Sequence, residues 1–170
     1  MTYQAPIGTG VGHVHLRVAD LDRAIAFYED VLGFHLQARV GNAAAFLGAR
    51  MPDGNVYHHH IGLNTWQSRG GMPAPLGHTG LYHAAILYPD RKALGIATRR
   101  VLEAGIQLSG ATDHGISEAV YLDDPDGNGI ELYRDRPQAD WPRDAAGNLV
   151  MDLKPLDVAA LLVEVEQGHA

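Results

Sequence analysis

The sequence predicts an α+β fold built from two βαβββ modules, and three observations lead to this prediction. The chain repeats itself, because a His, a strand-like apolar run and an Asp seven residues after the His occur from His13 and again from His83. A helical segment follows each Asp and ends at a Gly. Three short strand-like runs then follow in each half. We expect the two sheets to lie side by side with their helices outside, so that the inner faces form a cleft.

The two predicted helices begin and end on matching residues. Asp20 and Asp90 are expected to be N-caps, because a short carboxylate accepts hydrogen bonds from the free N–H groups of a first helical turn. Gly33 and Gly105 suit the left-handed conformation that ends many helices. Helical spacing of apolar residues predicts one buried face for the first helix, formed by Leu21, Ala24, Ile25, Tyr28, Val31 and Leu32.

Six strand-like runs follow the helices, three in each half. They cover residues 35–41, 43–49 and 56–64, and then 106–112, 117–123 and 129–134. The last two are separated by "DDPDGNG", which predicts a hairpin turn because Asp-Gly and Asn-Gly adopt positive φ at little cost.

The domain organisation follows from these runs. Module one is expected at about 10–66 and module two at about 80–136, within a single domain over residues 1–145. Residues 146–170 are expected to form a C-terminal tail with one short amphipathic helix in "LDVAALLVEVE". This tail is expected to serve packing or a dimer contact.

Composition excludes several classes of protein. The 170 residues include no Cys, which excludes disulfides, thiolate metal sites and a Cys nucleophile. The net charge of −7 and the lack of a basic cluster argue against a nucleic-acid partner. No apolar run approaches the roughly 20 residues that cross a bilayer, and "MTYQAPIGTG" does not resemble a signal peptide. We therefore expect a cytoplasmic protein without a membrane partner.

Two histidines and one glutamate form the candidate chemical site. His13 and His83 occupy the same place at the start of the two repeats. Glu131 stands between Ile130 and Leu132 in the last expected strand, so it faces the cleft if those two face the helices. A lone strand histidine is more often a hydrogen-bonded structural group, but repeat equivalence favours convergence here. Two imidazoles and one carboxylate form a first-row metal site with open positions.

The other histidines divide into three sets. His15 shares the strand face of His13 and is expected to lie in or near the cleft. His35, His78 and His169 are expected at the surface. Three more stand in a row at 58–60, inside a strand-like run, where their purpose is not evident from periodicity alone.

Four motifs together resemble the vicinal oxygen chelate superfamily, which includes glyoxalases, bleomycin resistance proteins and extradiol dioxygenases. They are "GHVHLRVADLDRAIAFYEDVLGF", "YHHHIGLNTW", "GLYHAAILYPDR" and "DHGISEAVYLDDPDGNGIELYRDRP". The resemblance covers residues from about 10 to about 145 and is strongest to the catechol-2,3-dioxygenase-like branch. It implies paired βαβββ modules that form a half-open, barrel-like sheet around a metal cleft.

The resemblance implies roles for particular residues. The metal ligands of the family match His13, His83 and Glu131. The "HGIS" stretch makes His114 the counterpart of a catalytic histidine, and a tyrosine ten residues before the ligand Glu corresponds to Tyr121.

A further catalytic histidine of the family falls in the triple-histidine run. The pattern His-His-x-(Ile/Leu)-(Ala/Gly)-Leu selects His59. Strand alternation groups His59 with Ile61 and Leu63 and favours His60 instead, unless a bulge interrupts the strand. His60 stays the rival assignment, with His58 as a third.

The implied function is extradiol ring cleavage in the catabolism of aromatic compounds. Fe(II), with Mn(II) as its alternative, would be the cofactor, and a catechol-type aromatic and O₂ the substrates of an expected homodimer. His59 would take a proton from the substrate, His114 and Tyr121 would bind its oxygens, and Trp66 would help to wall the ring. Many extradiol members have four modules, whereas this chain has two.

Three alternatives remain open. Glyoxalase-like or epimerase-like relatives are lyases or isomerases that use Ni(II) or Zn(II) without O₂. They usually take a carboxylate or amide from the place that is "HHH" here, which favours the dioxygenase. Metal-free, bleomycin-type binding proteins tend to lack the His/His/Glu set, and a thiol-transfer resistance enzyme would need more basic residues in the cleft.

Overall fold

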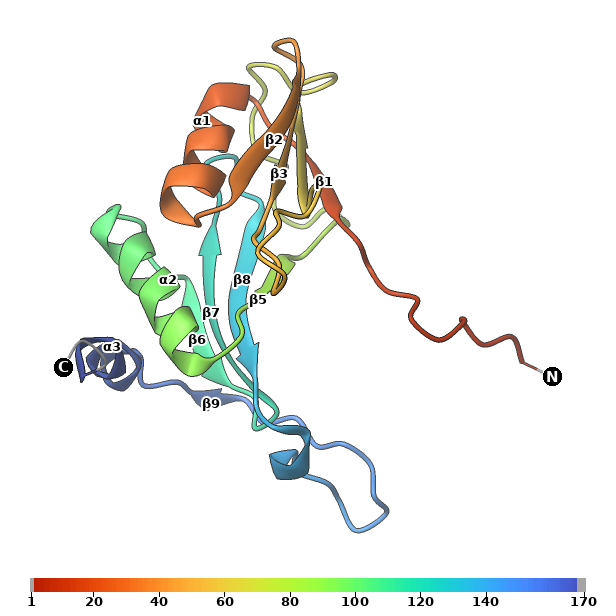
Figure 1. Ribbon diagram of the computed structural model, residues 1–170, viewed down its shortest axis with the longest axis vertical. Coiled ribbons are helices and arrows are strands. Elements are labelled where there is room, and N and C mark those ends of the chain that lie inside the picture. Colours follow the sequence, from red (N-terminus) through yellow and green to blue (C-terminus); the bar gives the residue numbers. More distant parts are fainter. Residues whose placement is uncertain (1, 168–170) are drawn as a thin grey trace. The chain divides into compact units, whose positions relative to one another are not determined.

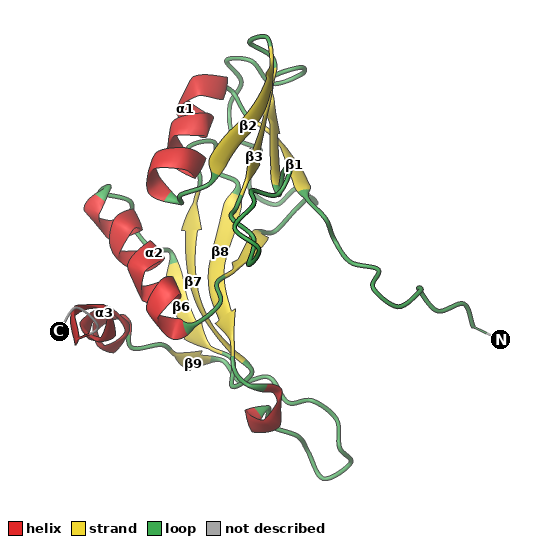
Figure 2. Ribbon diagram, viewed as in Figure 1, coloured by secondary structure: helices red, strands yellow, loops and turns green. Residues whose placement is uncertain are grey.

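The computed structural model describes residues 2–167 and divides the chain into two compact units, residues 1–72 and 73–170. Each unit holds one βαβββ module with its helix against one face of a sheet (Figures 1 and 2). The α+β class and the duplication predicted from the repeat are therefore confirmed. The grouping of both modules into one domain over residues 1–145 stays a prediction.

Each of the five elements of the first unit has a counterpart in the second, which adds β9 and α3. The first unit contains β1 (Val14–Arg17), α1 (Leu21–Ala26), β2 (His35–Val40), β3 (Ala44–Gly48) and β4 (Ile61–Asn64). The second contains β5 (Ala84–Leu87), α2 (Arg91–Glu103), β6 (Gly110–Asp113), β7 (Ser117–Asp123), β8 (Gly129–Asp135), β9 (Lys154–Pro155) and α3 (Val158–Gln167).

Both sheets have the same topology. The strand order is β1-β4-β3-β2 in the first and β5-β8-β7-β6-β9 in the second. The first strand of each module pairs in parallel with the last, and the other pairs are antiparallel. A parallel pair needs a crossover connection, which the helix and the two middle strands supply.

The predicted helix caps are confirmed. The carboxylate of Asp20 accepts a hydrogen bond from the backbone N–H of Arg23 at 3.1 Å, and Asp90 accepts one from Ala93 at 2.7 Å. Gly33 and Gly105 adopt φ values of 78° and 75°, in the left-handed region.

The first helix differs from the prediction in its second half. The α-helical pattern ends at Ala26, and the turn Phe27–Val31 is π-helical. The N–H of Leu32 donates to the carbonyl of Phe27, five residues back, at 3.2 Å. Apolar spacing does not distinguish these two helix types over one turn, because both bury Phe27 and Tyr28.

A bulge shortens the strand predicted at 56–64. β4 begins at Ile61, which pairs with Leu47, whereas the next bridge along the hairpin joins Val56 to Arg50. Four residues, 57–60, therefore stand opposite two, 48–49. A Cβ at position 48 would overlap the carbonyl oxygen of Tyr57, so only glycine allows this close passage.

The C-terminal residues belong to the second unit. β9 extends the sheet beside β6, and α3 packs along α2. Gly95 of α2 permits close contact, because a Cβ there would lie 2.6 Å from Cγ2 of Val165 and 2.9 Å from the carbonyl oxygen of Leu161. His35 is half-buried, His78 is exposed, and His169 lies outside the described residues. None of the helices within residues 2–167 has the length and apolarity that a membrane crossing requires.

A buried carboxylate connects the helices to the second sheet. Glu118 on β7 is only 4% exposed and accepts hydrogen bonds from Arg91 and Arg134 at 2.9 Å each, and from Arg136 at 3.1 Å. Arg91 also pairs with Glu164 of α3. Removing one partner of such a buried pair costs about 3–5 kcal/mol, so this cluster fixes α2 and α3 to the strands.

Replacing Gly95 by Ala should destabilise the protein, although Gly→Ala inside a helix normally stabilises by about 1 kcal/mol. The added Cβ overlaps α3, so α3 has to move. We expect the free energy of unfolding in urea to fall by about 1–3 kcal/mol. Adding Val165→Ala should recover part of this loss. A Gly95→Ala protein as stable as the wild type would contradict the close contact between α2 and α3.

Candidate metal centre

His83 and Glu131 meet because β5 and β8 are parallel neighbours. Glu131 is in register with Ala85, two residues after His83. Ile130 and Leu132 are buried on the helix side of β8, so Glu131 projects from the opposite face, as predicted. Nε2 of His83 lies 2.9 Å from Oε2 of Glu131.

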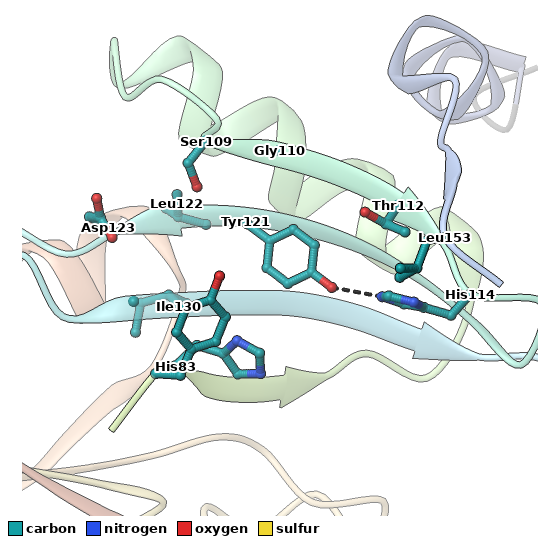
Figure 3. Close-up of a pocket in the computed structure, with 12 residues that line it drawn as sticks. His83, Ser109, Gly110, Thr112, His114, Tyr121, Leu122, Asp123, Ile130 and Leu153 are labelled. Atoms are coloured by element: carbon teal, nitrogen blue, oxygen red, sulfur yellow. Dashed lines mark hydrogen bonds between the residues drawn. The ribbon is translucent and has the colours of Figure 1, made fainter. Parts of the chain in front are cut away.

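A chain of hydrogen bonds extends from this pair. Tyr121 on β7 is the register partner of Glu131, and its hydroxyl donates to Oε1 of that carboxylate at 3.2 Å. The same hydroxyl lies 2.8 Å from Nε2 of His114, in the turn between β6 and β7 (Figure 3). The order His83–Glu131–Tyr121–His114 thus joins four of the six predicted site residues.

These groups open onto a pocket of about 590 Å³ formed by the second unit alone. His83, Tyr121 and His114 line it together with the apolar side chain of Leu153 (Figure 3). The volume and the mixture of apolar walls with a few polar groups are typical of a site for a small molecule.

The pKa of the Tyr121 phenol is raised to about 12. Burial is the main cause, and the neighbouring Glu131 carboxylate is the second. The phenol therefore keeps its proton at neutral pH and acts as a hydrogen-bond donor.

His13 and His59 lie together in the first unit. Their ring centroids are 4.5 Å apart, and the ring of Phe46 stands 5.1 Å from that of His59. His15, two residues after His13 and on the same strand face, contacts Phe46 and the exposed Trp66. The rings of His13, His15, Phe46, His59 and Trp66 therefore form one cluster in this unit.

The three adjacent histidines have different surroundings because they lie in the bulge and not in a regular strand. His58 is exposed, and its Nδ1 is 2.7 Å from Nδ1 of His59. His60 accepts a hydrogen bond at Nδ1 from the backbone of Ala49 at 3.1 Å and packs on the ring of Tyr57. The parity argument that favoured His60 therefore does not apply to residues 58–60.

Burial lowers the pKa of both His59 and His60. Charge repulsion from neighbouring histidines adds to this effect, chiefly from His13 at His59 and from His58 at His60. Both imidazoles are consequently biased towards the neutral form at neutral pH.

The donor atoms fit a first-row metal ion. Two ligand atoms at about 2.0–2.2 Å from one ion, in adjacent positions, lie about 3 Å apart, and Nε2 of His83 and Oε2 of Glu131 have this separation. Nδ1 of His83 is buried without a hydrogen-bond partner among the described residues. Neither unit by itself contains three His, Asp or Glu side chains grouped for a metal within residues 2–167. His83 and Glu131 are thus the pair of candidate ligands in the second unit.

One functional group was missed by sequence reasoning. The carbonyl oxygen of Asp152 lies 3.0 Å from Nδ1 of His114. A backbone carbonyl 38 residues away has no motif, so the sequence offered no signal for it.

Comparison with known proteins relates the chain to one superfamily. Residues 10–132 match the model of the Glyoxalase/Bleomycin resistance protein/Dioxygenase superfamily. Catechol-2,3-dioxygenase of Bacillus subtilis is 42% identical over 157 residues, which cover 92% of this chain and 52% of that protein. Lactoylglutathione lyase of Haemophilus influenzae is 32% identical over 129 residues, covering 73% and 91%. The chain therefore spans about half the length of the Bacillus relative and nearly all of the lyase.

Solved structures share the fold. A glyoxalase/dioxygenase from Nostoc punctiforme superposes with a TM-score of 0.61 at 23% identity, covering 81% of this chain and 99% of that one. This likeness supports the paired βαβββ architecture.

Glu131→Gln should lower the pKa of Tyr121 in the metal-free protein. Removing the carboxylate charge removes the second cause of the upward shift, whereas burial remains, so the pKa should settle between its ordinary value of about 10 and the present value of about 12. Alkaline ultraviolet titration measures this pKa after the titration curve of Tyr121→Phe is subtracted. Asp135→Asn, at the exposed end of the same strand, is the control. An unchanged Tyr121 pKa in Glu131→Gln would contradict the contact between the Tyr121 hydroxyl and Glu131.

Proposed function

Since the chain belongs to the Glyoxalase/Bleomycin resistance protein/Dioxygenase superfamily, we propose that it is an extradiol dioxygenase that inserts O₂ into the ring of a catechol-type aromatic compound. The observation that carries this proposal is the series of short polar contacts that runs from His83 through Glu131 and Tyr121 to His114. Three of these residues, His83, Tyr121 and His114, line one pocket. It combines a ligand pair with a protonated phenol and an imidazole. The identity to a catechol-2,3-dioxygenase supports the same reaction.

We assign the metal to Fe(II), held by His83 and Glu131 of the second module and His13 of the first. Two histidines and one carboxylate on one side of an ion are typical of non-haem Fe(II) oxygenases. When bound, the ion would take both substrate oxygens, lower the pKa of their hydroxyls and supply the electron transfer that O₂ requires. Mn(II) is the alternative metal for the same three ligands.

His59 is assigned as the general base. Burial and the nearby His13 keep its imidazole neutral, so Nε2 or Nδ1 can accept the proton of a substrate hydroxyl at neutral pH. His60 is less suited, because its Nδ1 already accepts the N–H of Ala49. Once protonated, His59 stabilises negative charge that develops on the substrate oxygens.

Tyr121 and His114 are assigned to bind and orient the substrate in the pocket. The Tyr121 phenol remains a donor at neutral pH, so it can hydrogen-bond a catecholate oxygen without losing its proton. His114 lies within reach of the same hydroxyl and can exchange a proton with the ring-cleavage product through it. Leu153 offers an apolar contact to the ring at the same pocket.

A metal-dependent lyase or isomerase is the second candidate. It is favoured by one observation, because the lactoylglutathione lyase relative is matched over 91% of its length. Such an enzyme would use Ni(II) or Zn(II) as a Lewis acid at the same ligands. The triple histidine argues for the dioxygenase, since it supplies imidazoles and no carboxylate or amide at 58–60.

Glu131→Gln should prevent stoichiometric iron binding after anaerobic loading, because an amide is a far weaker ligand than a carboxylate. His83→Ala and His13→Ala should have the same effect. Asp135→Asn changes a carboxylate on the same strand outside the ligand pair and should retain iron. Metal analysis of the desalted proteins measures the bound iron per chain. Full retention of iron by Glu131→Gln would refute the assignment of Glu131 as a ligand.

The Fe(II)-loaded protein should consume O₂ and form a yellow ring-opened product with at least one member of a broad catechol panel. His59→Asn should lower kcat/KM by about 10²–10⁴-fold, the range for loss of a general base. His78→Asn, which changes an exposed histidine elsewhere in the sequence, should stay near wild type. No product from any catechol would overturn the dioxygenase proposal. Isolation of nickel or zinc with activity towards a thiohemiacetal would favour the lyase.

A further inference from the structure

The chain returns to the candidate site after residue 150. The N–H of Asp152 donates to the carbonyl of His114 at 2.9 Å, and the carbonyl of Asp152 lies 3.0 Å from Nδ1 of the His114 ring. The next residue, Leu153, lines the pocket close to His114 (Figure 3). We call residues 151–155 the return segment. It lies outside the stretch 10–132 that matches the superfamily model.

The return segment is fixed to the sheet on the C-terminal side of Asp152. Thr112 and Asp113 of β6 pair with Pro155 and Lys154 of β9. Lys154 also forms an ion pair with the Asp152 carboxylate at 2.7 Å. The Asp152 carbonyl therefore has a defined position relative to the turn that carries His114.

This position dictates which nitrogen of His114 carries hydrogen. A carbonyl oxygen only accepts hydrogen bonds, so Nδ1 has to be the donor. In the neutral imidazole Nε2 then has a free lone pair, which faces the hydroxyl of Tyr121 at 2.8 Å. The single hydrogen of that hydroxyl lies between two acceptors, Nε2 of His114 and the carboxylate of Glu131.

Leu153 has a different role in the same segment. Its side chain is 81% exposed, although it is apolar and borders the pocket. An apolar group that packs against little protein and faces a pocket can gain contacts from a ligand.

We propose that the return segment is a positioning and specificity element of the site. The Asp152 carbonyl holds His114 as the Nδ1–H tautomer, so that Nε2 is the ring nitrogen left free to exchange a proton with the Tyr121 hydroxyl or the substrate. The Leu153 side chain limits the size and polarity of ring substituents. The assignment for Leu153 rests on the proposed function, whereas the tautomer assignment does not.

Nitrogen-15 NMR of the metal-free protein tests the tautomer directly. The ring correlations of His114, identified by their loss in His114→Gln, should have the Nδ1–H pattern in the wild type. The opposite tautomer in the wild type would overturn the proposal without any variant. This measurement does not depend on catalysis, so it stays informative if no catechol is cleaved.

Asp152→Pro removes the N–H that ties Asp152 to His114, and it should release the ring towards the Nε2–H tautomer. Asp152→Ala removes only the carboxylate, keeps the backbone bonds, and should leave the wild-type pattern. In the active enzyme Asp152→Pro should lower kcat by about 10–100-fold, as for other groups that orient site residues, and Asp152→Ala should not. An unchanged tautomer in a folded Asp152→Pro protein would overturn the role of this segment.

Leu153→Ala should raise kcat/KM for catechols with bulky apolar ring substituents relative to unsubstituted catechol by about tenfold, a change typical of one or two methylene groups in a pocket. Met151→Ala, an exposed apolar residue of the same segment that does not line the pocket, is the matched control. If this ratio of kcat/KM values is the same in both variants and in the wild type, the proposed role of Leu153 is overturned. Absence of any cleavage would instead count against the dioxygenase itself.

Discussion

The parallel pairing of the first strand with the last strand in each module is the constraint on which the candidate site depends. It joins His83 to Glu131 across 48 residues of sequence, at 2.9 Å between their side-chain atoms. An antiparallel hairpin joins neighbours only, so it could not bring these groups together. The same pairing in the first module places His13 next to the bulge that carries His59. Duplication of one topology therefore supplies imidazoles at equivalent positions without duplicating the carboxylate.

Strand β7 connects the chemistry of the pocket to the stability of the second unit. Tyr121 faces the pocket, whereas Glu118, three residues earlier, faces the opposite side of the sheet. Glu118 is clamped there by Arg91, Arg134 and Arg136. The phenol is consequently held by a strand whose other face is fixed by charge-assisted hydrogen bonds. Few backbone adjustments can move the hydroxyl away from Glu131 without disturbing this cluster.

Local signals in the sequence predicted most of the fold. The Asp90 cap, the Gly105 helix end and the alternation that turns Glu131 away from the core are each set by a few adjacent residues, and each is found as expected. The bulge opposite Gly48 was considered only as an alternative to a regular strand, because its presence depends on the register between two strands. The contact of the Asp152 carbonyl with His114 was not predicted, since backbone atoms carry no residue-type signal.

The late position of the return segment has a consequence for synthesis of the protein. The first sheet has all of its strands once residue 64 has left the ribosome, so the first module can fold while the second is still being made. The second sheet lacks β9, and His114 lacks its ring acceptor, until residue 155 has emerged. Nascent chains that end between residues 131 and 155 would therefore contain both His83 and Glu131, while the His114 ring still lacks its backbone acceptor.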